Sequence, residues 1–354
     1  MKRIASMLLA AGMILSLTAC GEKSTEKQLI AMDTVIAFRA DGKKAEEAIK
    51  SAEQMIYGLE AKLSRTREDS EVSVLNKNGT AEVSNTTWEL LKAARAYEEI
   101  TEGTFDITIA PVCDAWGFTT DNRQVPQETV LREKLELVDS RQIVLQYEED
   151  GKKSARLGNG QQIDLGGIGK GYVSDLMESL YAEYEIERGT VSLGGNVYVK
   201  GSKEDGSLWQ VGIQDPKQPS SDALVGMVGL SDGYAVTSGG YQRYFEQDGR
   251  IYHHIIDPET GYPADSGLTF VTVVAKAQGR TAGEETAGTG TMCDVLSTAL
   301  FVMGEERAVD FWRGSDLEFD LVLGTDDDRI LVTEGIADQF TPLQEEVYTY
   351  ETIS

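Results

Sequence analysis

Apolar residues recur every three to four positions in some segments of the chain and every two positions in others. Residues 29–40 alternate between apolar and polar side chains, which predicts a strand. Helical spacing over residues 43–63 predicts an amphipathic helix with a polar outer face. Thr86-Thr87-Trp88-Glu89 matches a capping box and predicts the start of a second helix, which continues through Tyr97. Further helices are predicted over residues 127–137, 171–184 and 292–303.

The second half of the chain is richer in strand patterns. Residues 190–193 and 197–200 flank Gly194-Gly195-Asn196, and residues 241–247 and 250–256 flank Asp248-Gly249, as in hairpins. Two more strands are predicted near residues 318–323 and 329–333. Helices mixed with antiparallel hairpins indicate an α+β fold with mixed or antiparallel sheets, not a doubly wound parallel sheet. Since no Pro-rich, Ser-rich or single-charge linker follows residue 28, we expect one globular unit.

The first 28 residues have the pattern of a targeting segment. Met1-Lys2-Arg3 precedes an apolar run over residues 4–19 that is shorter than a membrane span requires. The run ends in Leu17-Thr18-Ala19-Cys20, which resembles the lipobox of bacterial lipoproteins, where the signal is cut before a lipid-bearing Cys. We therefore expect a signal peptide at 1–19, a polar tether at 20–28 and a functional domain at 29–354. The lipid on Cys20 would hold this domain on the extracytoplasmic face of the cell membrane; the alternative is an ordinary secretory signal with a chance Cys.

Charge and composition narrow the range of ligands. The 354 residues include 33 Lys and Arg against 59 Asp and Glu, and the formal net charge of −26 repels polyanions such as nucleic acid. A phosphate-bearing ligand would need a metal ion, a few placed cations or backbone amides. Only 3 Cys and 2 His occur, which argues against zinc clusters and a disulfide-rich scaffold. Once Cys20 carries a lipid, Cys113 and Cys293 either pair or stay as free thiols.

The densest glycine cluster is Asp164-Leu165-Gly166-Gly167-Ile168-Gly169-Lys170-Gly171, between a short apolar strand and a helix. It matches neither a Walker motif nor G-x-G-x-x-G. Glycines nevertheless let a ligand approach the backbone, helix N-terminal amides favour an anion, and Lys170 adds a positive charge. Two interpretations stay open: a phosphate-binding loop, or a tight strand-to-helix turn with a solvated Lys170.

Two further sets of side chains suit chemistry. Asp294, Ser297 and Thr298 share one face of the helix predicted over 292–303, and a carboxylate with nearby hydroxyls offers oxygen ligands for Mg²⁺. The same residue types are also common helix caps. His253 and His254 are adjacent in a predicted strand and point to opposite faces, so we expect at most one of them to act as an acid or base in a given site. Packing under the sheet is the alternative for either ring.

Short segments matching one known family follow one another along nearly all of the expected mature chain. They are Met32-Asp33-Thr34, Gly103-Thr104-Phe105-Asp106-Ile107-Thr108, Trp116-Gly117-Phe118, the cluster at 164–171, Ser192-Leu193-Gly194-Gly195-Asn196, Thr237-Ser238-Gly239 with Tyr241 and Arg243, His254-Ile255-Ile256-Asp257-Pro258 with Thr260-Gly261, and Asp294 with Ser297-Thr298. Together they resemble the ApbE family, lipoprotein enzymes that act as FAD:protein FMN transferases. Each segment is short, but the ordered set is highly specific.

The resemblance implies a T-fold-like α+β unit that binds FAD, cleaves its pyrophosphate, moves FMN onto a Thr hydroxyl of an acceptor protein and releases AMP. It implies that His254 is the base and that Lys170 helps to gather charge at the breaking bond. Mg²⁺ or Mn²⁺ would be held by Asp294, Thr298, Ser297 and the carbonyl of Gly167. FAD would be contacted by Met32, Thr104, Phe105, Asp106, Asp164, Lys170, Arg243 and the main chain near Ile256.

The expected acceptors resemble the covalently flavinylated subunits of Rnf-type and sodium-pumping quinone oxidoreductase complexes, or exported FMN-binding domains. Two alternatives stay open: a pyrophosphatase that gives FMN and AMP to water, and a non-catalytic flavin-holding or solute-binding lipoprotein. The chain departs from many family members at Gly240, where they carry an acidic residue. It also departs at residues 278–290, whose Gly, Thr and Glu content indicates a flexible insertion.

Overall fold

The computed structural model describes residues 24–120, 122–218 and 222–354, and within them one large sheet has nine strands. Neighbouring strands are antiparallel except for the last pair, which is parallel. The α+β fold with mixed, mainly antiparallel sheets is therefore confirmed. The strands in order across the sheet are β1 (Ser24–Ala31), β2 (Thr34–Asp41), β6 (Arg188–Leu193), β7 (Asn196–Lys200), β10 (Gly233–Gly239), β13 (Leu268–Lys276), β14 (Asp320–Thr325), β15 (Arg329–Thr333) and β17 (Thr349–Ile353).

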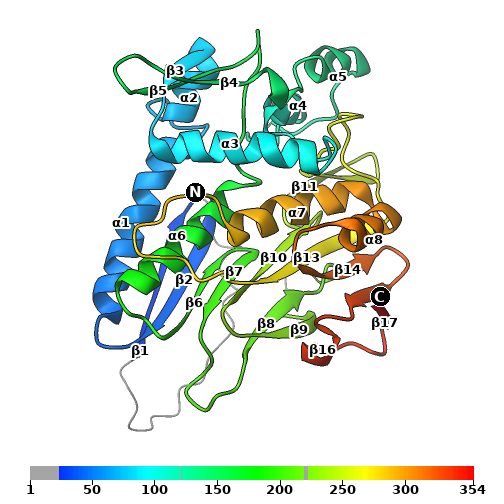
Figure 1. Ribbon diagram of the computed structural model, residues 1–354. Helices are drawn as coiled ribbons and strands as arrows, with labels where there is room; N and C mark the ends of the chain where they lie inside the picture. The colour runs from blue at the N-terminus through cyan, green and yellow to red at the C-terminus, as the bar shows by residue number, and fades with distance from the viewer. Residues whose placement is uncertain (1–23, 121, 219–221) are drawn as a thin grey trace.

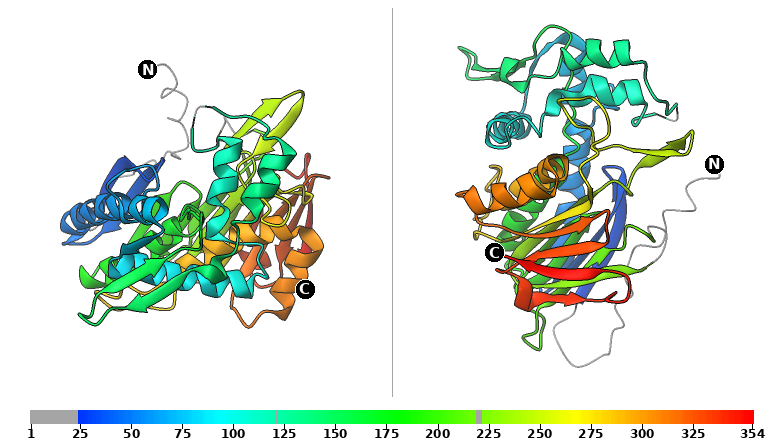
Figure 2. Two further views of the ribbon diagram at one scale, coloured as in Figure 1. Left: turned by 90° about the horizontal axis from the view of Figure 1, so that it is seen from above. Right: turned by 90° about the vertical axis from the view of Figure 1, so that its right-hand side faces the viewer.

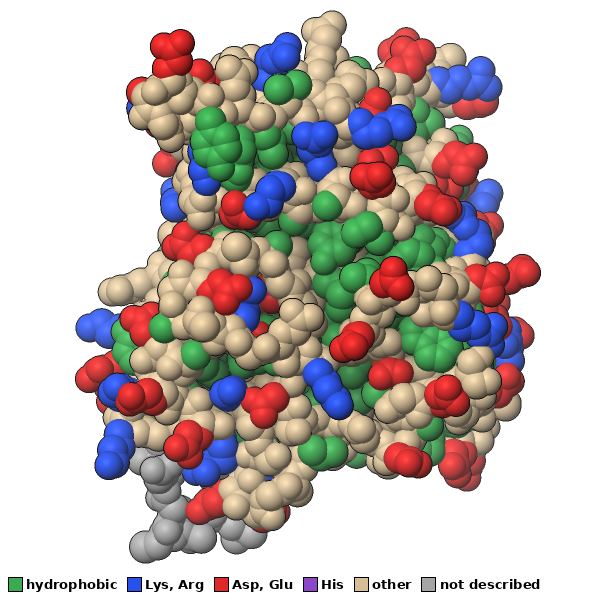
Figure 3. Space-filling view, viewed as in Figure 1, with side chains coloured by type: hydrophobic (Ala, Val, Ile, Leu, Met, Phe, Trp, Pro, Cys, Tyr) green, Lys and Arg blue, Asp and Glu red, His purple; other side chains and the backbone are tan. Residues whose placement is uncertain are grey.

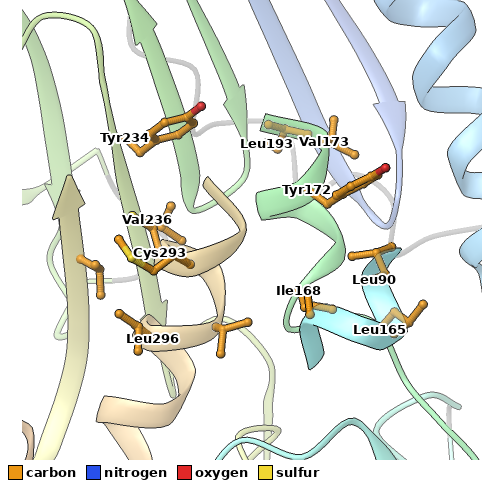
Figure 4. Close-up of a cluster of buried hydrophobic side chains, with 14 of the residues drawn as sticks. Leu90, Leu165, Ile168, Tyr172, Val173, Leu193, Tyr234, Val236, Cys293 and Leu296 are labelled. Atoms are coloured by element: carbon orange, nitrogen blue, oxygen red, sulfur yellow. The ribbon is translucent and has the colours of Figure 1, made fainter. Parts of the chain in front are cut away.

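Helices cover one face of this sheet: α1 (Ala45–Leu63), α6 (Gly169–Glu183), α7 (Thr289–Met303) and α8 (Glu305–Gly314) (Figure 1). Their apolar side chains form the main core with the sheet, and burial of such surface contributes roughly 25 cal/mol per Å². Figure 4 shows apolar side chains from α6, α7, β6 and β10 meeting in this core, among them Tyr172, Val173, Leu193, Tyr234, Val236, Cys293 and Leu296. This packing fixes the N-terminal ends of α6 and α7 relative to each other.

The other face of the sheet is covered by a small sheet with the order β16-β9-β8, made of β8 (Trp209–Gln214), β9 (Leu224–Leu230) and β16 (Phe340–Pro342). Central strands therefore have apolar residues on both faces. In β13, Val271 and Val273 belong to the helix-side core, whereas Val274 packs with Trp209 toward the small sheet. The large sheet is the middle of three layers.

An upper part of the molecule lies above the ends of α1, α6 and α7 (Figure 1). Beside it, the hairpin of β11 (Tyr244–Gln247) and β12 (Arg250–His253) projects from the body (Figure 2, right). Acidic and basic side chains are interspersed over the face seen in Figure 3. The upper part contains α2 (Glu71–Asn78), α3 (Asn85–Ile100), α4 (Ala110–Trp116), α5 (Glu128–Leu135), the 3-10 turns Ile107–Ile109 and Ser140–Gln142, and a sheet of β3 (Thr80–Glu82), β5 (Lys153–Arg156) and β4 (Val144–Tyr147).

The strongly periodic helices are confirmed, with α1, α5, α6 and α7 close to their predicted ranges. The predicted capping box at Thr86 is wrong, because the N-cap of α3 is Ser84. Thr87 lies inside the helix, and its hydroxyl donates to the carboxylate of Glu71 at 2.6 Å, as does the hydroxyl of Ser84 at 2.9 Å. The start of α3 is thus held by the carboxylate of Glu71 in α2 and not by a capping motif within α3 itself.

Two predictions near the N-terminus are corrected. Residues 29–40 form not one strand but a hairpin, whose two-residue turn is Met32-Asp33 with φ of 51° and 59°. Residues 24–28, predicted as tether, belong to β1 and pair with residues 37–41 of β2, because the ladder satisfies their backbone groups. The predicted signal peptide at 1–19 and the lipid site at Cys20 lie outside the described residues.

Residues 278–290 are held to α6 rather than forming a loose insertion. The Glu178 carboxylate accepts the N–H groups of Gly279 and Arg280, both at 3.0 Å. Asp175, fully buried, accepts the N–H groups of Gly288, Gly290 and Thr291. Side-chain caps from α6 therefore compensate for the weak helix and strand signals in this segment.

Two smaller findings complete the fold. Cys113 and Cys293 are free thiols, which settles the alternative left open by their number. Over residues 24–120, 122–218 and 222–354, every helix is too short or too polar to cross a membrane.

Candidate active site

The glycine cluster at 164–171 leads directly into α6 and lies between the upper part of the molecule and the helix layer. Asp164 shapes its first turn, because its carboxylate accepts the N–H of Gly166 at 2.8 Å. The N-cap residue of α6, Ile168, makes no capping hydrogen bond with its own side chain. Phe105 and Met32 line the cluster: a Cβ added to Gly167 would stand 3.1 Å from the Phe105 ring, and one added to Gly169 would stand 3.7 Å from the Met32 methyl carbon. The cluster is thus a tight turn that two predicted flavin contacts approach.

Asp294 connects this cluster to α7. Its Oδ2 accepts the N–H of Gly171 at 2.8 Å, and the side chain is buried. A Cβ on Gly171 would stand 2.3 Å from the carbonyl oxygen of Gly290, so the two helices approach closely only because Gly171 has no side chain. The other carboxylate oxygen, Oδ1, makes no hydrogen bond within the described part of the chain. Asp294 therefore combines one structural bond with one oxygen available to a ligand.

The residues predicted to hold a metal ion are brought together. The hydroxyl oxygen of Thr298 stands 3.8 Å from the position of a Cβ on Gly167, so α7 and the glycine cluster meet again one turn beyond Asp294. Among the described residues, no three His, Cys, Asp or Glu side chains form a metal-binding group. The predicted set has one carboxylate, hydroxyls and a carbonyl, which are hard oxygen donors that suit Mg²⁺ or Mn²⁺ when waters or ligand phosphates complete the coordination.

Ser297 and Ser238 extend the hydroxyl set. Ser297 donates to the carbonyl of Asp294 at 2.9 Å, and its Oγ lies 2.8 Å from that of Ser238 on β10. Ser238 Oγ also lies 3.2 Å from Thr298 Oγ1. Ser297 is fully buried, whereas Ser238 and Thr298 are partly exposed. The end of β10 thus contacts the predicted metal ligands through the Ser238 hydroxyl.

Other predicted flavin contacts have structural bonds of their own. Asp106 accepts from the N–H and hydroxyl of Thr108 with one oxygen and from the N–H of Ser140 with the other. Thr104 donates to the carbonyl of Thr101 at 2.8 Å. Both side chains thus hold the turn that presents Phe105. The Ile256 side chain is buried in a small cluster with Trp116, and its main chain pairs with Pro263.

His254 lies at the base of the β11–β12 hairpin. Its Nδ1 is 3.2 Å from the carbonyl oxygen of Arg243. A carbonyl only accepts, so Nδ1 carries the proton and Nε2 has the free lone pair. Burial, followed by the positive charges of Arg243, His253 and Lys170, lowers the pKa of His254 to about 3. The imidazole is therefore neutral at pH 7 and able to accept a proton at Nε2.

Lys170 and Arg243 supply the positive charge near His254. Within the described part of the chain, no carboxylate lies within ion-pair distance of Lys170, although the protein is strongly acidic. The exposed Arg243 has one distant partner, Asp33 in the strained turn, at 3.9 Å. Both cationic side chains are thus available to interact with a negatively charged ligand.

His253 has different surroundings, as its position in the strand predicts. Its Nε2 bonds to the carbonyl of Ala264 at 3.1 Å, and its ring packs edge-on against Phe301 at 5.4 Å. A Cβ on Gly240 would stand 2.8 Å from this ring, so the missing acidic side chain at Gly240 leaves room for His253. His253 is a packing residue in this structure.

Sequence reasoning gave no role to three residues that shape the site. Arg65 bridges Asp164 at 3.3 Å and Asp114 at 2.7 Å. Glu60 accepts the N–H of Met32 at 2.7 Å and holds the strained turn. Neither has a local signal, since each acts on a partner distant in sequence. Ser238 lies in Thr237-Ser238-Gly239, a segment already noticed, but only the fold reveals its contacts.

Comparisons with known proteins show what the chain as a whole is similar to. The model of the ApbE family matches residues 32–322. FAD:protein FMN transferase from Haemophilus influenzae is 29% identical over an alignment of 359 positions that covers 98% of this chain and 100% of that protein. The enzyme of the same name from Treponema pallidum is 30% identical over an alignment of 346 positions that covers 91% of each chain. The crystal structure of the ApbE protein from Thermotoga maritima superposes with a TM-score of 0.78 at 30% identity and covers 90% of this chain and 99% of its own. The chain belongs to the ApbE family.

Proposed function

We propose that this protein transfers FMN from FAD to a threonine hydroxyl of an acceptor protein and releases AMP. The relatives named FAD:protein FMN transferase support the reaction class. One observation carries the proposal for this chain: Asp294 and Thr298 meet the glycine cluster beside the neutral imidazole of His254 and beside Lys170, which has no ion-pair partner among the described residues. A pyrophosphate needs positive charge and oxygen-binding cations, and an attacking hydroxyl needs a base.

The chemistry is a phosphoryl transfer. The acceptor hydroxyl oxygen bonds to the phosphorus of the FMN half while the bond from that phosphorus to the bridging oxygen breaks. AMP leaves with the bridging oxygen. The hydroxyl proton passes to Nε2 of His254, whose ring is held in orientation by the bond from Nδ1 to the carbonyl of Arg243. Lys170 and Arg243 offset the charge that develops on the phosphate oxygens.

A divalent cation fits the donors in the site. Asp294 Oδ1, Thr298 Oγ1 and the carbonyl of Gly167 would hold Mg²⁺ or Mn²⁺, with Ser297 behind them. When bound, the ion would neutralise pyrophosphate charge and polarise the phosphorus. On the flavin side, Met32 and Phe105 offer apolar surface next to the cluster.

The cellular setting belongs to the same proposal. The lipobox-like Leu17-Thr18-Ala19-Cys20 supports a lipid anchor on the extracytoplasmic face of the membrane. An enzyme tethered there meets exported redox proteins, so acceptors of the Rnf-type, quinone oxidoreductase or FMN-binding-domain classes fit. A Cys20→Ser variant should lose membrane attachment or signal processing; unchanged fractionation would contradict the anchor.

The test is incubation of the purified chain with FAD, Mg²⁺ and candidate exported acceptors, followed by mass spectrometry of the acceptor. Transfer adds one FMN moiety to a Thr, and AMP appears in equal amount. Release of FMN and AMP without labelling of any acceptor would replace the transferase with a pyrophosphatase. Binding of FAD without either product would leave a flavin-holding protein.

A further inference from the structure

Three hydroxyl groups from two elements make a connected chain beside the predicted metal ligands. Ser297 and Thr298 come from α7, and Ser238 comes from the end of β10. The Oγ of Ser238 lies 2.8 Å from that of Ser297 and 3.2 Å from that of Thr298. The Ser297 hydroxyl also donates to the carbonyl of Asp294 at 2.9 Å. Because the donor of this last hydrogen bond is known, it determines the donor and the acceptor in the other two contacts.

Each hydroxyl has one proton to donate. The proton of Ser297 is used on the carbonyl of Asp294, because a carbonyl only accepts. In the contact between Ser238 and Ser297, Ser238 is therefore the donor. With its proton used, Ser238 can only accept in its contact with Thr298, so Thr298 is the donor there. The proton of Thr298 thus points toward Ser238, and its lone pairs are free on the side away from Ser238.

We propose that Ser238 is a positioning residue that orients the Thr298 hydroxyl for ligation of a divalent cation, an inference that rests on the metal site of the proposed function. A hydroxyl that is free to rotate can present its proton to the ion, which repels it. By accepting that proton, Ser238 keeps a lone pair available and lowers the cost of ordering Thr298. Hydrogen-bond partners of metal ligands commonly change metal affinity by about 10- to 100-fold.

The structure offers a matched control on the same strand. Thr237, next to Ser238, pairs its hydroxyl with that of Thr272 on β13 at 2.8 Å. Side chains alternate between the faces of a strand, so this second hydroxyl pair lies on the side away from α7. Thr237→Val removes a hydroxyl bond of similar length and leaves the chain of hydroxyls at Thr298 intact.

The experiment measures Mn²⁺ binding to the full chain by calorimetry and by the EPR signal of free Mn²⁺, without flavin or acceptor. Ser238→Ala should weaken Mn²⁺ binding by about tenfold or more. Ser238→Thr, which keeps the hydroxyl, and Thr237→Val should bind as the parent does. Equal affinity in Ser238→Ala, or an equal loss in Thr237→Val, would overturn the proposal. Thermal unfolding curves of each variant show whether a loss of binding comes from a loss of the fold.

A second variant keeps the proposal testable if Ser238→Ala fails to fold. In Ser297→Ala the acceptor for Ser238 is gone, so the Ser238 proton can turn to Thr298 and cover the lone pair that the ion needs. Mn²⁺ affinity should fall in this variant also. The double variant should bind Mn²⁺ no more weakly than the more affected of the two single variants, because both substitutions break the same series of hydroxyl hydrogen bonds. Additive losses of Mn²⁺ affinity would contradict a shared series.

The two proposals can fail separately. If the parent binds Mn²⁺, Ser238→Ala does not, and no acceptor is labelled, the positioning role stands and the transferase fails. If the parent labels an acceptor and Ser238→Ala binds Mn²⁺ equally well, the positioning role fails alone. A parent that binds no Mn²⁺ overturns the positioning role and the metal site together.

Discussion

The α6–α7 contact and the base of the β11–β12 hairpin approach the same glycine cluster but are built differently. At the α6–α7 contact, Asp294 is buried and bonded to Gly171, and Asp175 and Glu178 secure the segment that leads into α7. At the hairpin base, Arg243 is half-exposed, and its one described partner, Asp33, is distant. Buried, bonded groups suit a fixed phosphate and metal geometry, whereas the hairpin base sets the partly buried ring of His254 beside the exposed side chain of Arg243. The predicted metal ligands and the predicted base thus come from two regions that are held in place by different kinds of contact.

The largest effect is expected at the hairpin base. His254→Ala removes the proposed proton acceptor, so flavin transfer should fall about 10²- to 10⁴-fold. His253→Ala is the matched control: it removes packing against Phe301 and should lower stability more than transfer. Acceptor labelling and thermal unfolding of both variants check this. The opposite pattern would place His253 in the site.

Asp294→Asn tests the chemistry of the buried region. The amide oxygen can still accept the Gly171 N–H, so the fold should survive, but a charged ligand is lost. We expect transfer to fall by roughly 10²- to 10³-fold, because charge stabilisation at the breaking bond is reduced. Steady-state rates as a function of Mg²⁺ concentration measure the effect. Chelator-insensitive activity in the parent would contradict it.

Gly171→Ala tests the packing of the same region. The new methyl group would stand 2.3 Å from the carbonyl oxygen of Gly290, which forces α6 and α7 apart. We expect a loss of about 1–3 kcal/mol in the free energy of unfolding. Gly58→Ala in α1, where a Cβ meets nothing within 4 Å, should instead gain roughly 0.5–1 kcal/mol. Urea unfolding compares the two; equal effects would refute the close contact.

The depressed pKa of His254 has a consequence for stability. Its pKa is about 3 in the folded chain against an ordinary 6.5, so between these values the unfolded chain binds the proton and the folded chain does not. Stability should therefore fall as the pH drops from about 6.5 toward 3 and be unaffected by this group above that window. His254→Ala should show a shallower loss in urea unfolding at pH 5 relative to pH 8. An unchanged slope would contradict the burial of a neutral ring.

The smallest effect is expected at the outer ion pair of the hairpin base. Asp33 is exposed and lies 3.9 Å from Arg243, and such pairs contribute about 0–1 kcal/mol. Asn tolerates the positive φ of Asp33, so Asp33→Asn should alter the free energy of unfolding by less than about 0.5 kcal/mol. A larger change in urea unfolding would mean that the hairpin base is as tightly held as the α6–α7 contact.

Local patterns in the sequence determined most regular elements. The period of apolar residues located α1, α6 and α7, and the turn residues at 194–196 and 248–249 located two hairpins, because helix and hairpin formation depend on neighbouring residues. The motifs also selected Asp294, Thr298, Lys170 and His254 as candidate site residues. How these groups face one another was not encoded in any short segment.

Tertiary structure decided the rest, because the deciding contacts join residues far apart in sequence. Glu71 replaces the capping box at α3, and Glu60 holds Met32 in a backbone conformation that a bulky residue rarely adopts. Residues 24–28 form a strand because they pair with β2, and residues 278–290 are held by hydrogen bonds to the α6 carboxylates. The role of Ser238 exists only because β10 ends beside α7, where the direction of three hydroxyl bonds is set by one carbonyl.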